Sequence, residues 1–243
     1  MQHSRLYENF HKNTKIQKKV IKRRNFTYQH IFYFLFKYLK KNDRILDIGC
    51  GAGTIGIFLA THEYTVKGID ISQSAIHTAN ESAQYLHLQN VQFEVNKFPY
   101  DDIDGKYDFI ICSEVLEHLK EEKKALEKIY TLLRKNGTLL ITVPSLNAPL
   151  YRLGYATSFD KRVGHLRRYT QESLEKLLIE SKFTIIEKAK NEGIIRNFLF
   201  LNPVAGKFVR FIKFSLVDIV TYVDYLSFKL FGESNIIIVA RKT

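Results

Sequence analysis

The sequence predicts a single α/β domain whose parallel sheet is covered by helices on both faces. The chain has 243 residues, 45% of them hydrophobic and 26% charged. This composition supports one sizeable core and excludes a disordered or fibrous protein. From residue 44 onward, short apolar runs typical of buried strands alternate with amphipathic stretches typical of helices. Such alternation is characteristic of consecutive βαβ units and therefore of a parallel sheet.

The individual elements follow from that alternation. The predicted strands cover residues 44–49, 65–70, 91–95, 107–113, 138–144, 183–188 and 235–242. The predicted helices cover 26–39, 54–62, 72–88, 114–135 and 170–181. Ser72 is a suitable N-cap for the helix that follows it, and Gly137 can cap the helix that ends at 135. Two insertions interrupt the pattern: 145–169, which we expect to be a long functional loop, and the apolar segment 190–233.

The net charge of +12 is concentrated near the N-terminus. Residues 1–44 hold twelve Lys and Arg residues against only Glu8 and Asp43. Such a segment either binds an anionic partner (nucleic acid, acidic lipid or a phosphorylated substrate) or is a solvated face. The run 207–216, KFVRFIKFSL, combines basic and aromatic residues, so it either lies on an anionic membrane or packs against the sheet. Segments 1–44 and 190–233 are therefore the candidate peripheral membrane contacts.

Cysteine content and the N-terminal residues favour a reducing compartment. Cys50 and Cys112 are too few for a disulfide framework or a four-cysteine zinc site, and both stand in apolar runs. The first residues lack the apolar core of a signal peptide, and no window has about 18 uninterrupted apolar residues. We expect a cytoplasmic protein, either free or peripheral at the inner face of the membrane.

A glycine-rich turn follows the first predicted strand and is the most informative motif. Gly49, Gly51 and Gly53 allow the backbone to turn tightly and approach a ligand closely, at the N-terminus of a helix. Asp70 ends the next strand, so its carboxylate should reach the same sheet edge and accept the hydroxyls of a ribose.

Two cofactors compete for this motif. Gly51, Gly53 and Gly56 also satisfy the dinucleotide fingerprint G-x-G-x-x-G, which keeps a nicotinamide or flavin enzyme open. Asp47 favours the other interpretation: its carboxylate would repel a pyrophosphate but suits the cationic amino acid end of S-adenosylmethionine.

These motifs resemble those of the class I S-adenosylmethionine-dependent methyltransferases. ILDIGCGAG resembles their first motif, GID their ribose-binding acid, and LLRKNGTLLITVP the end of their core. The resemblance covers roughly residues 44–189 and the closing strand. It implies a Rossmann-like, doubly wound sheet of seven strands, mostly parallel with an antiparallel last strand, plus helical insertions. The catalytic domain is then 44–243, and 1–43 is a basic helical segment that caps the cofactor site.

The same resemblance implies the cofactor contacts. Asp47 and the glycines would line the methionyl and ribose part, and Asp70 would hold the ribose. Asn96 stands where the family usually carries an aspartate near the adenine amine, and its amide oxygen can still accept a hydrogen bond. The full predicted set is Asp47, Gly49, Cys50, Gly51, Gly53, Asp70, Ile71, Asn96, Lys97 and Ser113.

The reaction centre is predicted where the fourth strand ends. On a helix, Glu114, Glu117 and His118 would share one face, and His165 from the first insertion would join them. The cluster is either a general base with its orienting partners or the ligand set of a divalent cation such as Mg²⁺; a structural role is the third interpretation. The pattern resembles two groups, the O-methyltransferases of ubiquinone biosynthesis and the RNA 2′-O-methyltransferases of small-RNA 3′ ends. In both, the resemblance implies a metal that binds the acceptor oxygens.

We therefore predict an S-adenosylmethionine-dependent O-methyltransferase. Its acceptor would be a small phenolic, sugar-like or lipid-linked molecule, methylated by direct in-line transfer that leaves S-adenosylhomocysteine. Glu117, His118 and His165 are the predicted catalytic residues. Arg167 and Arg168, in a stretch resembling methyltransferases of cell-envelope and sugar biosynthesis, either clamp an anionic acceptor or are surface charges. The alternatives are an RNA 2′-O-methyltransferase, which is less favoured because no RNA-binding module is visible, and a non-catalytic binding protein.

Overall fold

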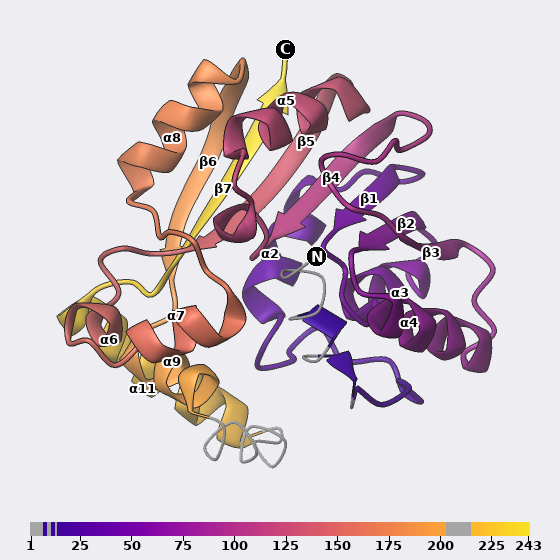
Figure 1. Ribbon diagram of the computed structural model, residues 1–243. Coiled ribbons are helices and arrows are strands. Elements are labelled where there is room, and N and C mark those ends of the chain that lie inside the picture. Colours follow the sequence, from indigo (N-terminus) through magenta and orange to yellow (C-terminus); the bar gives the residue numbers. More distant parts are fainter. Residues whose placement is uncertain (1–6, 9–10, 13, 203–214) are drawn as a thin grey trace.

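The computed structural model describes residues 7–8, 11–12, 14–202 and 215–243 and contains a seven-stranded sheet in the order β3-β2-β1-β4-β5-β7-β6 (Figure 1). Strand β7 pairs antiparallel with both β5 and β6, and the other pairings are parallel. The predicted mostly parallel sheet with an antiparallel last strand is confirmed. The strands are β1 (Arg44–Ile48), β2 (Thr65–Asp70), β3 (Val91–Val95), β4 (Tyr107–Ser113), β5 (Leu133–Pro144), β6 (Phe183–Asn191) and β7 (Asn235–Lys242).

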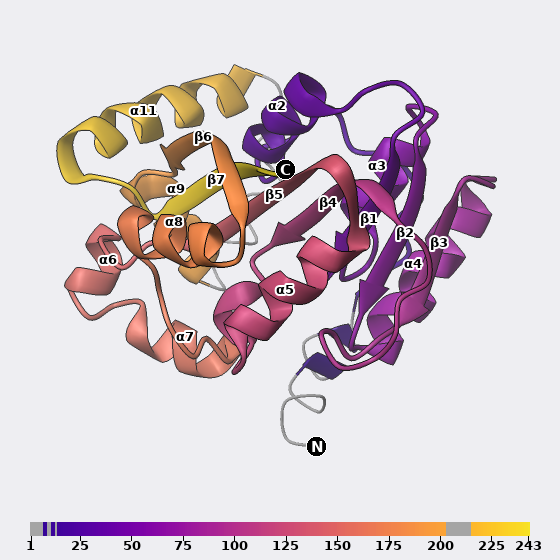
Figure 2. The same cartoon turned by 90° about the horizontal axis from the view of Figure 1, so that it is seen from above.

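Helices cover both faces of this sheet, as Figure 2 shows for α2 and α3 on one side and α5 and α8 on the other. Alternate strand residues face the two layers: Leu46 and Ile48 join the core under α5 and α8, whereas Ile45 joins the core under α2, α3 and α4. Burial on both faces explains why the strands are apolar runs. The helices are α2 (Gln29–Tyr38), α3 (Thr54–Ala60), α4 (Gln73–Tyr85), α5 (Glu122–Leu132) and α8 (Gln171–Glu180).

Side-chain caps are present at the first turns of α4 and α8. The Ser72 hydroxyl accepts a hydrogen bond from the backbone N–H of Ala75, at 3.1 Å, and so caps α4 as predicted. Helix α8 begins with a capping box between Thr170 and Ser173. Both caps satisfy N–H groups that the first helical turn leaves unpaired.

The predicted helix 114–135 is confirmed only over Glu122–Leu132, and its first eight residues are not α-helical. Glu114 has a left-handed backbone (φ 55°), a short 3₁₀ turn η1 spans Leu116–His118, and α5 starts only at Glu122. The side chain of Val115 packs so closely on Gly49 that a Cβ at Gly49 would lie 2.3 Å from it. This contact between the β4 end and the glycine turn overrides the local helix propensity. Glu114 therefore shares no helix face with Glu117 and His118.

The predicted cap at Gly137 is also wrong. Helix α5 ends at Leu132, and β5 begins directly at Leu133, which pairs with Tyr107 of β4. Asn136, rather than a glycine, carries the left-handed conformation (φ 61°), and Gly137 lies inside the strand. Strand pairing thus begins earlier than the glycine signal indicates.

The two insertions are largely helical and gather beyond the carboxyl end of the sheet (Figure 1). Segment 145–169, expected as a loop, contains α6 (Pro149–Arg152) and α7 (Thr157–Val163). Segment 190–233 contains α9 (Ile194–Leu201) and α11 (Ser215–Phe231), while most of the basic run 207–216 lies outside the described residues. None of the helices in the described ranges has the length and apolar character needed to cross a bilayer.

Helical structure in the N-terminal segment is interrupted. Tyr7, Glu8 and His11 are helical, residues 14–28 contain no α-helix, and α2 begins at Gln29. Residues 15–24 carry six Lys and Arg residues and no acid, and like charges three and four positions apart oppose a helix. The segment is nevertheless attached to the domain, since the N–H of Gln17 donates to the Ser82 hydroxyl of α4 at 2.9 Å.

Candidate functional site

A cavity of about 1350 Å³ opens at the carboxyl edge of the sheet. Small-molecule sites are usually about 300–1,000 Å³, so this one has room for a nucleoside cofactor and a second molecule. Its walls come from the ends of β1, β2 and β4, the N-terminal segment, and helices α7 and α9. This is the edge at which open α/β sheets bind ligands.

The glycine turn fixes Asp70 in this cavity. Gly49 and Gly51 have positive φ angles of 71° and 52°, which only glycine adopts at little cost. The N–H of Gly51 donates to Oδ2 of Asp70, and the N–H of Ser72 donates to Oδ1, both at 2.9 Å. Each carboxylate oxygen retains a second lone pair. Asp70 is thus held rigidly while still able to accept hydrogen bonds from a ligand.

Asp47 is a buried carboxyl group in the middle of this site. Asp47 is only 2% exposed, and its Oδ2 has no hydrogen-bond partner among the described residues. Burial, together with the charge of Asp70, raises the pKa of Asp47 to about 8. A buried carboxylate without a donor is costly, so the position fits a ligand that brings a positive charge.

Asn96 directly follows β3, and its side chain also contains a buried oxygen without a hydrogen-bond donor among the described residues. Its Nδ2 donates to the carbonyl of Asp102 at 3.0 Å, while its buried Oδ1 has no partner in the described part of the chain. That oxygen suits an amine donor, which is what the family resemblance implies for this position.

Most of the other predicted cofactor residues also reach the cavity. Gly53 is the exception, because it lies outside the lining, and a Cβ there would stand 2.6 Å from the ring of Phe93. Its role in the structure is close packing of α3 (φ 77°). The remaining predicted residues that line the cavity are Gly49, Cys50, Gly51, Asp70, Ile71, Lys97 and Ser113.

The N-terminal segment lies against the same cavity. The ring of Tyr7 contacts the ring of His118 edge-on, with centroids 5.5 Å apart, and His11 stands beside Gly51. Glu8 accepts hydrogen bonds from the N–H groups of Gln73 and Ser74 at the start of α4. The described residues of this segment thus bridge the glycine turn and the reaction centre.

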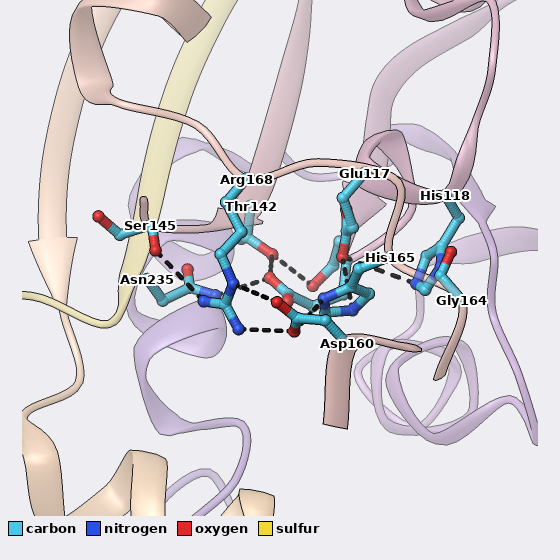
Figure 3. A network of polar contacts seen from close by, with 11 residues as sticks. Glu117, His118, Thr142, Ser145, Asp160, Gly164, His165, Arg168 and Asn235 are labelled. Atoms are coloured by element: carbon cyan, nitrogen blue, oxygen red, sulfur yellow. Dashed lines mark hydrogen bonds and ion pairs between the residues drawn. The ribbon is translucent and has the colours of Figure 1, made fainter. Parts of the chain in front are cut away.

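At the predicted reaction centre, Glu117 is completely buried between two imidazoles (Figure 3). Its Oε1 lies 3.7 Å from Nε2 of His118 and 3.8 Å from Nε2 of His165. Neither carboxylate oxygen has a hydrogen-bond donor within the described ranges. Burial, with a smaller effect of Glu114, raises the pKa of Glu117 well above its usual range.

Both histidines are oriented through their other nitrogen. Nδ1 of His118 lies 3.2 Å from the carbonyl oxygen of Gly164, and Nδ1 of His165 lies 3.0 Å from Oδ1 of Asp160. Burial alone would raise the pKa of Asp160, but the hydrogen bonds from His165 and Arg168 lower it, so this carboxylate is ionised. A carbonyl and a carboxylate only accept, which assigns a proton to each Nδ1; in a neutral imidazole the lone pair is then on Nε2, which faces Glu117.

The arginines of the first insertion are already engaged. Arg168 binds both oxygens of Asp160 at 2.7 Å through Nε and Nη2, and Nη1 of Arg167 binds Glu122 at 2.7 Å. Arg168, which also lines the cavity, thereby holds Asp160 in place (Figure 3). Both arginines are paired with carboxylates of the protein itself, and a role toward an anionic acceptor stays a prediction.

Glu114 lies apart from the group formed by Glu117, His118 and His165, whose ligand atoms are all within 4.8 Å of one another. Its Oε1 accepts hydrogen bonds from the Thr142 hydroxyl at 2.9 Å and from Asn235 Nδ2 at 2.6 Å. Glu114 lines the cavity, so it is positioned to contact an acceptor rather than to complete that group.

Comparison with known proteins identifies the family. Residues 20–188 match a methyltransferase domain family. The chain belongs to this family of methyltransferases. With the observed sheet, it is a class I S-adenosylmethionine-dependent member, as the sequence motifs predicted.

Curated relatives include ubiquinone biosynthesis O-methyltransferases. The protein from Coxiella burnetii is 30% identical over 112 residues, which cover 46% of this chain and 47% of the relative. The protein from Rickettsia akari is 32% identical over 112 residues, covering 45% and 43%. The methyltransferase thus spans about half the length of the curated relatives it matches.

Solved structures share the fold at low identity. Phosphoethanolamine N-methyltransferase 2 of Haemonchus contortus, in complex with S-adenosyl-L-methionine, aligns with a TM-score of 0.68 and 18% identity, over 97% of this chain and 60% of that one. A putative sarcosine dimethylglycine methyltransferase of Galdieria sulphuraria aligns with a TM-score of 0.65 and 13% identity, over 100% and 99%.

Four residues of the methyltransferase site were missed by sequence reasoning. Tyr7 and His11 stand about 40 residues before the first motif. Asp160 stands five residues before His165, a spacing that is visible in the sequence but common without any contact. Glu192 lines the cavity with a left-handed backbone (φ 60°), and its pKa is raised to about 7 by burial despite the nearby Arg196. No motif marks it.

The raised pKa of Asp47 predicts how the stability of the cofactor-free methyltransferase depends on pH. An unfolded aspartate has a pKa of about 4, whereas Asp47 in the fold has a pKa of about 8. Between these values the folded state binds the additional proton, so the free energy of unfolding falls as pH rises. We expect Asp47→Asn to become progressively more stable than the wild type across this window, by up to about 1.4 kcal/mol per pH unit.

Urea denaturation at several pH values between about 5 and 8 measures this difference. Asp104→Asn, which changes an exposed carboxyl outside the cavity, is the matched control and should give a curve parallel to the wild type. A curve for Asp47→Asn that is also parallel to the wild type would contradict the assignment.

Proposed function

We propose that the cavity binds S-adenosylmethionine through three acceptor groups that lie at the ends of β1, β2 and β3. Asp47 would receive the ammonium of the methionyl part, Asp70 the ribose hydroxyls, and Asn96 the adenine amine. Two of these groups have acceptor atoms without a hydrogen-bond donor, which supports the proposal. Asp47 Oδ2 and Asn96 Oδ1 are both buried and have no partner among the described residues. The cofactor offers donors of the required kinds.

We infer further that the methyl acceptor is a hydroxyl group of a small, partly apolar molecule such as a phenol. The cavity beyond the glycine turn is lined by Phe159, Phe200 and Leu201, which suit an aromatic or lipid-linked acceptor. The curated relatives are named as O-methyltransferases of ubiquinone biosynthesis. In the transfer, a C–O bond forms as the C–S bond breaks in line with it, and the electron pair stays on sulfur, which leaves S-adenosylhomocysteine.

Glu117, His118 and His165 fit a divalent cation. Because metal–ligand bonds are about 2.0–2.3 Å long, atoms less than roughly 4.5 Å apart can bind one ion, and the three ligand atoms here meet or nearly meet that limit. Asp160 and Gly164 orient the two imidazoles, as outer contacts of metal-bound histidines do. When bound, the cation would polarise the acceptor hydroxyl and lower its pKa. Two imidazoles with one carboxylate favour Mn²⁺, Fe²⁺ or Zn²⁺ over Mg²⁺, which prefers oxygen.

The same geometry also supports proton transfer without a cation. Nε2 of His165 can take the proton of the acceptor hydroxyl, and the ionised Asp160 would stabilise the resulting imidazolium. The cation is favoured because the carboxylate of Glu117 is buried and has no hydrogen-bond donor among the described residues.

Asp70→Ala tests the cofactor site. The substitution removes a charged acceptor, so we expect S-adenosylmethionine to bind at least about 10-fold more weakly. Isothermal titration calorimetry measures the affinity. Glu127→Ala, at an exposed position of α5 outside the cavity, is the control and should bind like the wild type. If the wild type binds no S-adenosylmethionine, the protein is not an enzyme of this kind.

Glu117→Gln tests the cation and its role. We expect the wild type to bind one Mn²⁺ by calorimetry and to release S-adenosylhomocysteine when supplied with a catechol. Glu117→Gln, which keeps the side-chain size, should weaken Mn²⁺ binding and catechol methylation by at least about 10-fold. His77→Asn, at an exposed histidine of α4, is the control.

Two results would contradict the proposed binding and role of a cation. One is a wild type that binds no Mn²⁺; the other is an activity that a chelator leaves unchanged. An activity that then falls with protonation of a histidine at low pH would assign the role to His165 as base.

A further inference from the structure

Helix α11 turns two polar side chains toward the protein and several apolar side chains outward. Asp224 and Ser227 are 4% and 7% exposed, whereas Tyr222 and Leu230 are 62% and 77% exposed. Surface helices of globular proteins normally have the opposite arrangement. Five of the exposed apolar residues recur every three or four positions and so form one stripe: Ile219, Tyr222, Val223, Leu226 and Leu230. Tyr225 and Phe231 are also exposed but lie to either side of it.

Hydrogen bonds to α9 fix this orientation. Oδ2 of Asp224 accepts from the N–H of Gly193 at 2.9 Å, and Oδ1 accepts from the N–H of Arg196 at 2.8 Å. The Ser227 hydroxyl accepts from the N–H of Ile194 at 3.1 Å. Helix α9 has no side-chain cap of its own, so α11 supplies the partners that its first turn requires. Rotating α11 to bury the stripe would break all three bonds.

The stripe lies beside the basic part of the chain. Nη1 of Arg24 is 3.8 Å from Asp218 at the start of α11, and Gln29 of α2 donates to the Thr221 hydroxyl at 3.1 Å. Figure 2 shows α11 next to α2 at the edge of the molecule. Arg24 belongs to the segment 1–44 with its twelve Lys and Arg residues, and α11 itself carries the exposed Lys229.

We propose that the stripe of α11 is a docking surface for an anionic lipid bilayer. The helix would lie flat in the headgroup region with its apolar side chains at the acyl boundary, as amphipathic interfacial helices do. Tyr222 combines an apolar ring with a hydroxyl, which suits this boundary. Lys229 and Arg24 would meet the lipid phosphates.

A second copy of the chain is a poorer match for the surface. A helix of 17 residues is roughly 25 Å long and about 12 Å wide, so the stripe offers on the order of 300 Å². A stable interface buries about 800 Å² on each partner. Copies with a net charge of +12 also repel one another, whereas the same charge attracts anionic lipid.

Docking at α11 would place lipid close to the acceptor side of the cavity. Helix α9 packs against α11, and its residues Asn197, Phe200 and Leu201 line the cavity. One helix would thus separate the bilayer from the acceptor site. The inference goes beyond the proposed methyl transfer and does not depend on it.

Sedimentation of the full chain with vesicles tests the proposal. We expect binding to phosphatidylcholine vesicles containing about one third phosphatidylglycerol to be at least about 10-fold stronger than to pure phosphatidylcholine, and to weaken with salt. The variant Ile219→Ser/Leu226→Ser/Leu230→Ser should lose at least about 10-fold of this binding. Tyr85→Ser/Ile179→Ser, which removes equally exposed apolar residues from α4 and α8, is the matched control and should bind like the wild type.

Three results would overturn the proposal. The first is a wild type that does not sediment with anionic vesicles, and the second is a triple variant that binds them undiminished. The third is a wild-type dimer in sedimentation velocity that the triple substitution dissociates, which would assign the stripe to a second copy. If the triple variant does not fold, the single variant Leu230→Glu at the most exposed position gives the same readout. Calorimetry with S-adenosylmethionine in the absence of vesicles reports the proposed enzymatic function separately.

Discussion

A buried carboxyl group at the end of β1, close to a second carboxylate at the end of β2, is the constraint on which the rest of the site depends. Parallel strand pairing brings Asp47 and Asp70 to one sheet edge, and the glycine turn between them fixes Asp70 through backbone N–H groups. Asp47 receives no comparable compensation, so its burial opposes ionisation. A cationic ligand removes that penalty. Part of the binding free energy for such a ligand therefore comes from relieving the cost of burying Asp47 in the cofactor-free protein.

The predicted reaction centre also contains a buried carboxyl group, that of Glu117. Its carboxylate is buried and has no hydrogen-bond donor in the described part of the chain, while Asp160 and Gly164 orient the two histidines through Nδ1 so that each Nε2 faces it. Arg168 in turn holds Asp160. Asp160 and Arg168 are thus paired with each other, whereas Glu117 has no hydrogen-bond donor among the described residues. Such an arrangement is stable only if the central charge is neutralised by a proton or by a bound cation.

Much of this architecture is predictable from sequence because it depends on periodicity and on glycine geometry. The strands, the Ser72 cap and the positions of Asp47 and Asp70 follow from those signals. The first part of the helix predicted at 114–135 is wrong because the packing of Val115 on Gly49, residues 66 positions apart, outweighs local propensity. Asp160 and Glu192 belong to the two insertions. The helices of these insertions carry no sequence motif, so the surroundings of the two residues could not be predicted. The outward apolar face of α11 likewise depends on hydrogen bonds to α9 that periodicity cannot reveal.

The most direct test of the account is the number of protons released when S-adenosylmethionine binds. With a pKa of about 8 in the free protein, Asp47 is mostly protonated at pH 7 and must ionise to receive an ammonium group. Calorimetry in buffers of different ionisation enthalpy should therefore report release of nearly one proton per bound cofactor, and Asp47→Asn should abolish it. Binding heats that do not depend on the buffer would contradict the central role of Asp47.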